Sequence, residues 1–99
     1  MPWVYMLRCS DGSFYVGSTT DLDARISQHN SPDLGAAYTR RRRPVMLVWS
    51  AETELIGEAF RLEKQIQGWS RRKREALIRG DYDEVVAAAR RRAGRPRDR

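Results

Sequence analysis

Near its start the chain reads Trp3-Val4-Tyr5-Met6-Leu7, then Ser10-Asp11-Gly12, then Phe14-Tyr15-Val16-Gly17. The two apolar runs are rich in aromatic and β-branched residues, which favour strands, and the segment between them is typical of a turn. The sequence therefore predicts a β-hairpin with strands over residues 3–8 and 14–18.

The length of the turn decides which side chains share a face of this hairpin. A two-residue loop, Asp11-Gly12, leaves Tyr5 and Tyr15 on opposite faces. A three-residue loop that ends in a left-handed glycine pairs Cys9 with Ser13 and brings both tyrosines to one face. We favour the three-residue loop, and we expect both tyrosines to be exposed on that face.

A helix is predicted from residue 20 or 21 to about residue 30, because Thr20-Asp21-Leu22-Asp23 offers a cap and carboxylates for a first turn. Leu22 and Ile26 mark its buried side. Arg25 and His29 lie one turn apart and project together beside that side. Taken singly, Arg25 is typical of a surface arginine, and His29 of a helix end where the dipole favours it.

The remaining pattern completes an α+β domain. The run Pro44–Trp49 indicates a buried third strand. Helices follow from about Glu54 to Trp69, from Ser70 to about residue 80, and from there to about Arg92. We expect a three-stranded antiparallel sheet flanked by helices over residues 1–89, followed by a basic, disordered tail over residues 90–99.

Glu63 is the sharpest anomaly in the sequence. It falls inside a broad apolar arc of the predicted helix, made by Leu55, Ile56, Ala59, Phe60, Leu62, Ile66 and Trp69. A carboxylate there is costly unless it is paired or binds a metal, because its desolvation is unfavourable by several kcal/mol. One role that fits Glu63 is therefore that of a metal ligand. The alternative is a buried salt bridge, with Arg25 as a partner.

The positive charge is concentrated in a few segments. The net charge is +6, and residues 90–99 contribute +5 of it through six arginines and one aspartate, which leaves the remainder nearly neutral. Within that remainder the cations cluster at Arg40–Arg43 and Arg71–Arg74. Clusters of this kind are typical of a surface that faces a polyanion, and we take Arg40, Arg41, Arg72 and Lys73 as substrate-binding candidates. The alternative is a solvated loop and a solvated helix face.

Length and composition bound the class of protein. A chain of 99 residues supports one core, and its single cysteine excludes an intrachain disulfide. Cys9 and His29, the only residues of their types, do not suffice for a zinc site. No apolar run approaches the roughly 20 residues that span a bilayer, and no signal peptide is recognised. We expect a cytoplasmic protein with no membrane association.

Together, Tyr5, Tyr15, Arg25, His29 and Glu63 supply a proton acceptor, a cation and a metal ligand, which phosphodiester hydrolysis requires. The paired segments Trp3-Val4-Tyr5 and Tyr15-Val16-Gly17, with Arg25, His29 and Glu63 in order behind them, resemble the GIY-YIG nuclease superfamily. The resemblance runs from Trp3 to about Ile78. It is closest to small single-domain bacterial members, which also resemble the catalytic subunit of the structure-selective eukaryotic nuclease.

The resemblance implies a role for each residue. Tyr5 would be the general base, Arg25 would bind the scissile phosphate, and Glu63 would hold one Mg²⁺ or Mn²⁺ ion. Tyr15 would orient phosphate or water, and His29 would assist proton transfer or hydrogen-bond Tyr5. By the same resemblance Gly17 would allow close approach of the backbone, and Tyr38 and Thr39 are further candidates in a loop that would line the cleft.

The function implied is a metal-dependent endonuclease acting on DNA, with branched or single-stranded DNA in repair or recombination as its substrate. The sequence departs from the family pattern at Trp3, which replaces a leading glycine, and in lacking an asparagine after Glu63. Two alternatives remain: a nucleic-acid-binding module with a weak or inactive site, and the nuclease subunit of a complex whose protein partner supplies substrate choice.

Overall fold

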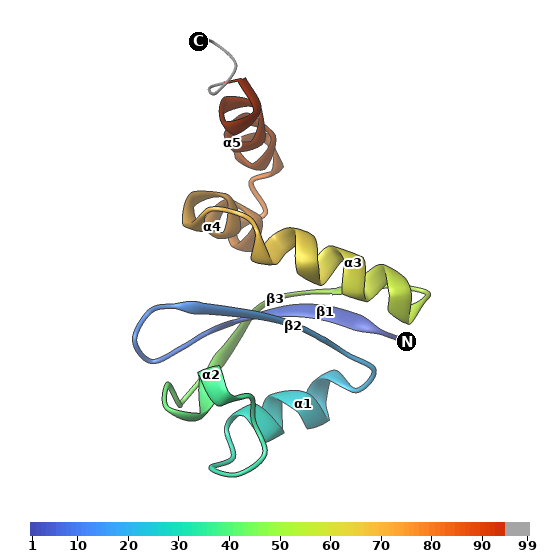
Figure 1. Cartoon of the computed structure of the whole chain (residues 1–99), viewed down its shortest axis with the longest axis vertical. Helices are drawn as coiled ribbons and strands as arrows, with labels where there is room; N and C mark the ends of the chain where they lie inside the picture. The colour runs from blue at the N-terminus through green and yellow to red at the C-terminus, as the bar shows by residue number, and fades with distance from the viewer. Residues whose placement is uncertain (95–99) are drawn as a thin grey trace. The chain divides into compact units, whose positions relative to one another are not determined.

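The structure is a computed structural model that describes residues 1–94. Its elements are β1 (Trp3–Arg8), β2 (Phe14–Thr19), α1 (Leu22–His29), α2 (Ala37–Arg40), β3 (Met46–Glu52), α3 (Ile56–Gln67), α4 (Arg71–Arg79) and α5 (Tyr82–Gly94) (Figure 1). The expected α+β class is confirmed, with an antiparallel sheet in the order β2-β1-β3. The chain divides into two compact units, residues 1–67 and a second unit that begins at Gly68. Each is described by itself.

The hairpin has the predicted three-residue turn. The Cys9 amide donates to the Ser13 carbonyl at 2.8 Å, and Gly12 is left-handed with φ 85°. In this register Tyr5 faces Gly17 across the strands, so Tyr5 and Tyr15 share a face as expected. Their predicted exposure is wrong for Tyr5, which is 1% exposed and packs in the core, whereas Tyr15 is partly buried.

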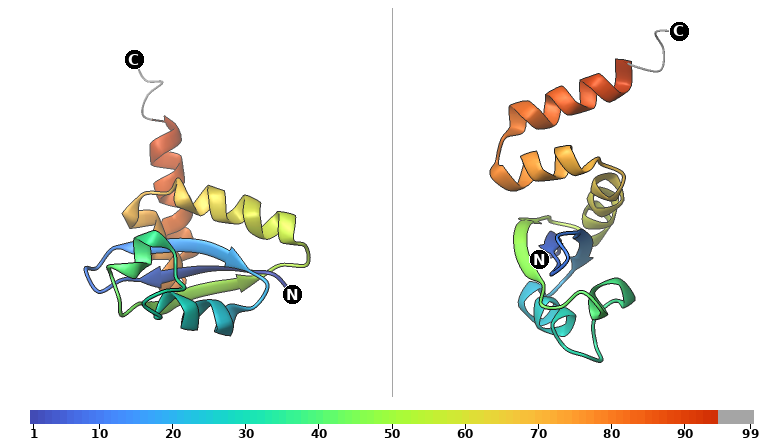
Figure 2. Two further views of the ribbon diagram at one scale, coloured as in Figure 1. Left: turned by 60° about the horizontal axis from the view of Figure 1, so that its bottom comes forward. Right: turned by 90° about the vertical axis from the view of Figure 1, so that its left-hand side faces the viewer.

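The two faces of the sheet are covered by different helices (Figures 1 and 2). On the tyrosine face, Leu22 and Ile26 of α1 pack against a cluster of Tyr5, Leu7, Cys9 and Val45. On the other face, α3 contacts β1 and β2 and contributes the buried residues Ala59 and Ile66. Because side chains alternate along a strand, those of β1 and β2 pack against α1 on one face of the sheet and against α3 on the other.

The third strand differs from the prediction of a buried run. β3 begins at Met46, pairs only with β1 and lies at the edge of the sheet, and Met46 is 65% exposed. Val45, the residue before β3, is bound by Asn30 at the end of α1. Asn30 Oδ1 accepts a hydrogen bond from the Val45 amide at 2.8 Å, and Asn30 Nδ2 donates one to the Val45 carbonyl at 3.2 Å. One side chain thus joins the end of α1 to the start of β3.

The apolar arc predicted for the long helix is only partly buried. α3 begins at Ile56, and Leu55, Ile56 and Phe60 are exposed, Phe60 by 52%. The arc is broader than the strip that faces the sheet, because a helix that packs on one layer buries a single stripe. Among the described residues, no helix is both long and apolar enough to cross a membrane.

The second unit contains α4 and α5, which contact each other. Ser70 caps α4 as predicted, its side chain accepting from the Lys73 amide, and Gly80 ends it in the left-handed conformation. α5 runs to Gly94, beyond the expected end at Arg92, so it includes residues that the sequence assigned to the tail. Residues 95–99 lie outside the described part of the chain, and the disordered tail remains a prediction.

Candidate active site

A chain of buried hydrogen bonds links the hairpin to the two helices on its tyrosine face. The Tyr5 hydroxyl lies 2.8 Å from His29 Nε2, and His29 Nδ1 lies 2.8 Å from Thr39 Oγ1. The Thr39 hydroxyl in turn donates to the Ala36 carbonyl at 3.1 Å. His29 and Thr39 are both fully buried. Thr39 is therefore a partner of His29 inside the protein, and not the cleft-lining residue that the sequence predicted.

Tyr15 lies beside this chain. Its ring centroid is 6.4 Å from that of Tyr5 and 5.0 Å from that of His29. Gly17 explains how closely the rings approach the sheet, because a Cβ at this position would lie 2.5 Å from the Tyr5 hydroxyl oxygen and 3.1 Å from a Tyr15 ring carbon. Gly17 thus makes room for the phenol of Tyr5, where the sequence had predicted room for a substrate.

Arg25 places a positive charge close to Tyr5 and His29. Its Nη1 donates to Gln28 Oε1 at 2.8 Å, and among the side chains that the structure describes, no carboxylate forms an ion pair with it. Burial lowers the pKa of His29 to about 4, and the Arg25 charge adds to that effect. Burial also raises the pKa of Tyr5 to about 12, although Arg25 works in the opposite direction. Both groups are neutral at pH 7, so the charges that act on Tyr5 are those of Arg25 and, more weakly, of Glu63.

Glu63 approaches from the other face of the sheet, across strand β2. Its Oε1 accepts from Ser18 Oγ at 2.6 Å and its Oε2 accepts from Gln67 Nε2 at 2.8 Å. Gln67 Nε2 also donates to the Val16 carbonyl at 3.2 Å, which fastens this end of α3 to β2. The carboxylate is therefore satisfied without the ion pair to Arg25 that was the alternative. Its ion pair is with the exposed Lys64, at 3.9 Å.

These contacts leave Glu63 able to bind a divalent ion. Its side chain is 14% exposed, and each of its two oxygens accepts one side-chain hydrogen bond, which leaves further lone pairs on both. No group of three or more His, Cys, Asp or Glu side chains in the described residues forms a complete metal cage. One carboxylate fits Mg²⁺, which keeps several waters and is commonly held by one or two carboxylates together with substrate phosphates.

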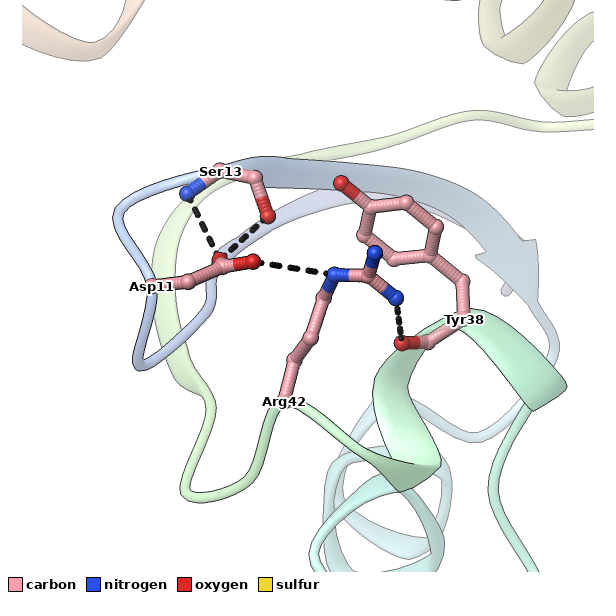
Figure 3. Close-up of polar contacts among 4 residues, drawn as sticks. All are labelled: Asp11, Ser13, Tyr38 and Arg42. Carbon is pink, nitrogen blue, oxygen red and sulfur yellow. Dashed lines mark hydrogen bonds and ion pairs between the residues drawn. The ribbon is translucent and has the colours of Figure 1, made fainter.

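Tyr38, whose ring lies beside that of Tyr15, belongs to a cluster that the sequence did not predict. Figure 3 shows the four residues of this cluster, Asp11, Ser13, Tyr38 and Arg42. The two tyrosine ring centroids are 6.0 Å apart, and the Arg42 guanidinium lies 4.0 Å from the Tyr38 centroid. Arg42 also donates to the Tyr38 carbonyl and to Asp11 Oδ2, and the other oxygen of Asp11 accepts from the amide and hydroxyl of Ser13. This cluster ties the turn of the hairpin to α2.

The arginine run is mostly engaged with the protein itself. Arg42 belongs to the Tyr38 cluster, and Arg43 donates to the carbonyls of Arg40 and Asn30. Arg40 makes one long contact, 3.5 Å, with the Gly35 carbonyl. Arg41 is exposed, and its side chain forms no hydrogen bond or ion pair with the described residues. Of the two residues predicted here to bind substrate, Arg41 is the freer cation.

The candidates Arg72 and Lys73 lie on α4, in the second unit. Arg72 forms an ion pair with Glu84 of α5, and Lys73 Nζ lies 4.1 Å from the Trp69 ring centroid. Arg71 pairs with Glu75 at 3.0 Å. Cations in the first turn oppose the helix dipole, and these carboxylates offset that effect within the unit. The cluster is therefore partly accounted for by contacts inside the protein.

Sequence reasoning missed four residues that hold the candidate site: Ser18, Gln67, Asp11 and Arg42. For two of them, Gln67 and Ser18, the sequence contained a signal that could have identified them. Gln67 lies four residues after Glu63, which places both on one side of a helix. Ser18 follows Gly17, so the hairpin register already assigns it to the face opposite the tyrosines. Asp11 and Arg42 are 31 positions apart, and nothing local indicates their contact.

Comparison with known proteins gives a consistent result. A family model described as the GIY-YIG catalytic domain matches residues 1–76. A UPF0213 protein of Halobacterium salinarum is 46% identical over 78 residues, which cover 79% of this chain and all of that protein. A UPF0213 protein of Staphylococcus aureus is 43% identical over 77 residues, which cover 78% of this chain and 93% of that protein.

Solved structures extend the similarity to three dimensions. A UPF0213 protein from Bacillus halodurans, determined by solution NMR, is 44% identical and matches with a TM-score of 0.52 over 86% of this chain and 94% of that one. A protein from E. faecalis, also determined by NMR, is 35% identical and matches with a TM-score of 0.55 over 81% of this chain and 84% of that one.

Proposed function

The chain belongs to the GIY-YIG family, a superfamily of endonucleases, and we propose that it is itself a metal-dependent endonuclease that hydrolyses phosphodiester bonds in DNA. Branched or single-stranded DNA in repair or recombination is the proposed substrate. The proposed catalytic residues are Tyr5, Tyr15, Arg25, His29 and Glu63.

The observation that carries the proposal is the position of Arg25. Its guanidinium has no carboxylate partner among the described side chains, and it lies close enough to Tyr5 and His29 to influence both of their pKa values. Burial keeps those two groups neutral at pH 7, so Arg25 supplies the positive charge that favours an anion there, while the Glu63 carboxylate, whose charge also acts on Tyr5, is available for a cation. A phosphodiester bound there would lie next to a hydrogen-bonded Tyr–His pair, which offers a route for a proton.

The proposed proton transfer uses Tyr5 and His29 together. A phenol whose pKa is about 12 is a poor base by itself at neutral pH, because it keeps its own proton. The hydrogen bond to His29 Nε2 gives that proton an acceptor: as the Tyr5 oxygen accepts a proton from the attacking water, its own proton passes to His29, a transfer that the low pKa of His29 makes uphill. Arg25 stabilises the charge that grows on the phosphate, and Tyr15 orients the phosphate or the water.

GIY-YIG nucleases generally use divalent metal ions, and Glu63 is the residue that would hold one here. The ion, proposed to be Mg²⁺ or Mn²⁺, would supply stabilisation of the leaving oxygen when bound. Ser18 and Gln67 hold the two carboxylate oxygens in place and so fix the direction in which the remaining lone pairs point.

A second function is a nucleic-acid-binding module that does not cleave, and the burial of Tyr5 favours it. A residue that is 1% exposed is harder for a water molecule to reach than the surface tyrosine expected from the sequence. The two functions differ in one observable, because a binding module shifts DNA in a gel but leaves its length unchanged in the presence of Mg²⁺ or Mn²⁺.

The test is a cleavage screen of purified protein against flaps, forks, single strands, duplex DNA and RNA, with each metal and with a chelator. We expect metal-dependent products from DNA and none with the chelator. Tyr5→Phe, which keeps the ring and removes the hydroxyl, should abolish cleavage while DNA is still bound. Absence of products with every substrate, alongside retained binding, would favour the binding module. A protein that cleaves only after a co-purified partner is added would be the nuclease subunit of a complex.

A further inference from the structure

We propose that Thr39 is a positioning residue, which holds His29 in the tautomer that carries its proton on Nδ1 and so keeps Nε2 free to accept the proton of Tyr5. The inference deepens the proposed function and rests on it for its catalytic consequence. Its structural part, the tautomer itself, stands on hydrogen bonds alone.

The assignment starts at Tyr5. The buried phenol has one proton to donate, and its two side-chain partners are Arg25, whose guanidinium can only donate, and His29 Nε2, at 2.8 Å. A buried donor without an acceptor is unfavourable, so Nε2 must be the unprotonated nitrogen that accepts. The proton of the neutral imidazole therefore lies on Nδ1.

The other end of the chain gives the same answer. With its proton on Nδ1, His29 donates to Thr39 Oγ1 at 2.8 Å, and the Thr39 hydroxyl is left to donate its own proton to the Ala36 carbonyl at 3.1 Å. Every donor then has an acceptor. The opposite tautomer reverses both His29 contacts and leaves the Tyr5 proton without an acceptor.

The backbone around Thr39 is built closely onto His29. A Cβ at Gly35 would lie 2.9 Å from the His29 Cα, 3.1 Å from the Gln28 carbonyl oxygen and 3.1 Å from Thr39 Oγ1. The segment that carries Thr39 can therefore approach the end of α1 because residue 35 has no side chain. Thr39 and His29 are each fully buried, so water does not replace the hydroxyl as the partner of Nδ1.

The catalytic consequence is directional. A proton can leave Tyr5 for His29 only while Nε2 has a free lone pair, and in the opposite tautomer Nε2 donates to the phenol oxygen instead. Thr39 touches neither substrate nor metal in this scheme. It acts through His29, which makes its hydroxyl, and not its size, the property that matters.

The chain contains a single histidine, so its imidazole can be observed without assignment ambiguity. The experiment is a long-range ¹H–¹⁵N correlation spectrum of the ¹⁵N-labelled full-length protein at neutral pH, for the wild type, Thr39→Ser and Thr39→Val. We expect a protonated Nδ1 and an unprotonated Nε2 in the wild type and in Thr39→Ser. In Thr39→Val, which keeps the shape and loses the hydroxyl, signals of the Nε2-protonated tautomer should appear.

Cleavage of single-stranded or flap DNA in saturating amounts gives the second readout. Thr39→Ser should retain the wild-type rate, and Thr39→Val should lose about a hundredfold, the scale of a lost acid–base contribution. A wild-type spectrum with the proton on Nε2 overturns the inference, and so does a Thr39→Val spectrum that shows only the Nδ1-protonated form. A changed tautomer with an unchanged rate overturns the catalytic part. If the wild type cleaves nothing, the proposed function fails, but the spectra still decide the tautomer. If Thr39→Val does not fold, the spectra of the wild type and Thr39→Ser decide the tautomer.

Discussion

The Tyr5 hydroxyl and His29 Nε2 lie 2.8 Å apart, although 24 positions separate the two residues in the chain. The contact joins the central strand of the sheet to the last turn of α1, inside the core. A polar pair buried in this way is stable because both groups are neutral and each is the partner of the other. The same pair that we propose for proton transfer is therefore part of what holds the fold together.

The low pKa of His29 predicts a pH dependence of stability. The unfolded chain takes up a proton on this residue near pH 6.5, whereas the folded protein does so only near pH 4. The free energy of unfolding should therefore fall as the pH is lowered from 6.5 to 4, by up to about 3 kcal/mol, with no further loss from this group below pH 4. Urea titrations at several pH values measure it, and His29→Gln should flatten this part of the curve. A wild-type curve that is already flat between pH 4 and 6.5 would contradict the prediction.

Gly17 is predicted to tolerate no side chain. In Gly17→Ala the new methyl group would meet the phenol of Tyr5 at 2.5 Å, so the ring or the strand must shift, at a cost of about 1–3 kcal/mol in unfolding free energy. Gly57→Ala is the matched control, because a Cβ there meets nothing within 4 Å and alanine favours the helix. Thermal unfolding of both variants checks the prediction. Equal stability of the two would mean that Tyr5 does not occupy the space beside Gly17.

Glu63→Gln is predicted to abolish metal-dependent cleavage and to keep the fold. The substitution preserves size and most of the hydrogen-bonding capacity toward Ser18 and Gln67, while it removes the anionic ligand. Glu54→Gln, on an exposed position of the same unit, controls for the change in net charge. Cleavage rates across a Mg²⁺ or Mn²⁺ titration are the measurement. Should Glu63→Gln cleave normally but unfold several kcal/mol more easily, the role of Glu63 is structural.

Arg25 and Arg41 are predicted to separate turnover from binding. Arg25→Ala should lower the single-turnover rate at saturating protein by roughly a hundredfold, with little change in affinity, because Arg25 stabilises charge in the transition state. Arg41→Ala should instead weaken DNA binding and reduce the slope of log affinity against log salt by about 0.9, the value for one lost phosphate contact, with an unchanged saturated rate. Salt titrations and rapid-mixing assays measure the two effects. If Arg25→Ala weakens only binding, Arg25 is an ordinary backbone contact.

The register of the hairpin could be predicted from the sequence because it depends on local features. A glycine suited to the left-handed conformation fixed the turn, and alternation along the strands then placed Tyr5 and Tyr15 on one face. The cap of α1 is local in the same way: Asp21 accepts from the Ala24 amide, as its position before the helix indicated.

The errors arose where distant parts of the chain decide. Tyr5 is buried because Val45 and α1 cover it. The residues next to Tyr5 in the sequence do not indicate whether such distant segments pack on it. The third strand is apolar, yet Met46 is exposed because the strand order puts β1, and not β3, in the centre of the sheet. Glu63 was correctly recognised as unusual, but the distant side chain that hydrogen-bonds to it is Ser18, 45 positions away, and not Arg25.

The two hydrogen bonds between Asn30 and Val45 close the intervening chain into a loop whose ends are 15 positions apart. The entropy of bringing such ends together grows only slowly with length, so added residues cost little once the closing contact is made. Within the loop, Gly35 and Thr39 contact His29, whereas Pro32, Asp33 and Leu34 are exposed. The Leu34 carbonyl accepts a hydrogen bond from Arg25 Nη1 at 3.5 Å, so residues 32 and 33 are the place where we expect a linker, a tag or a whole inserted domain to enter the chain with least disturbance to the helix end and the strand.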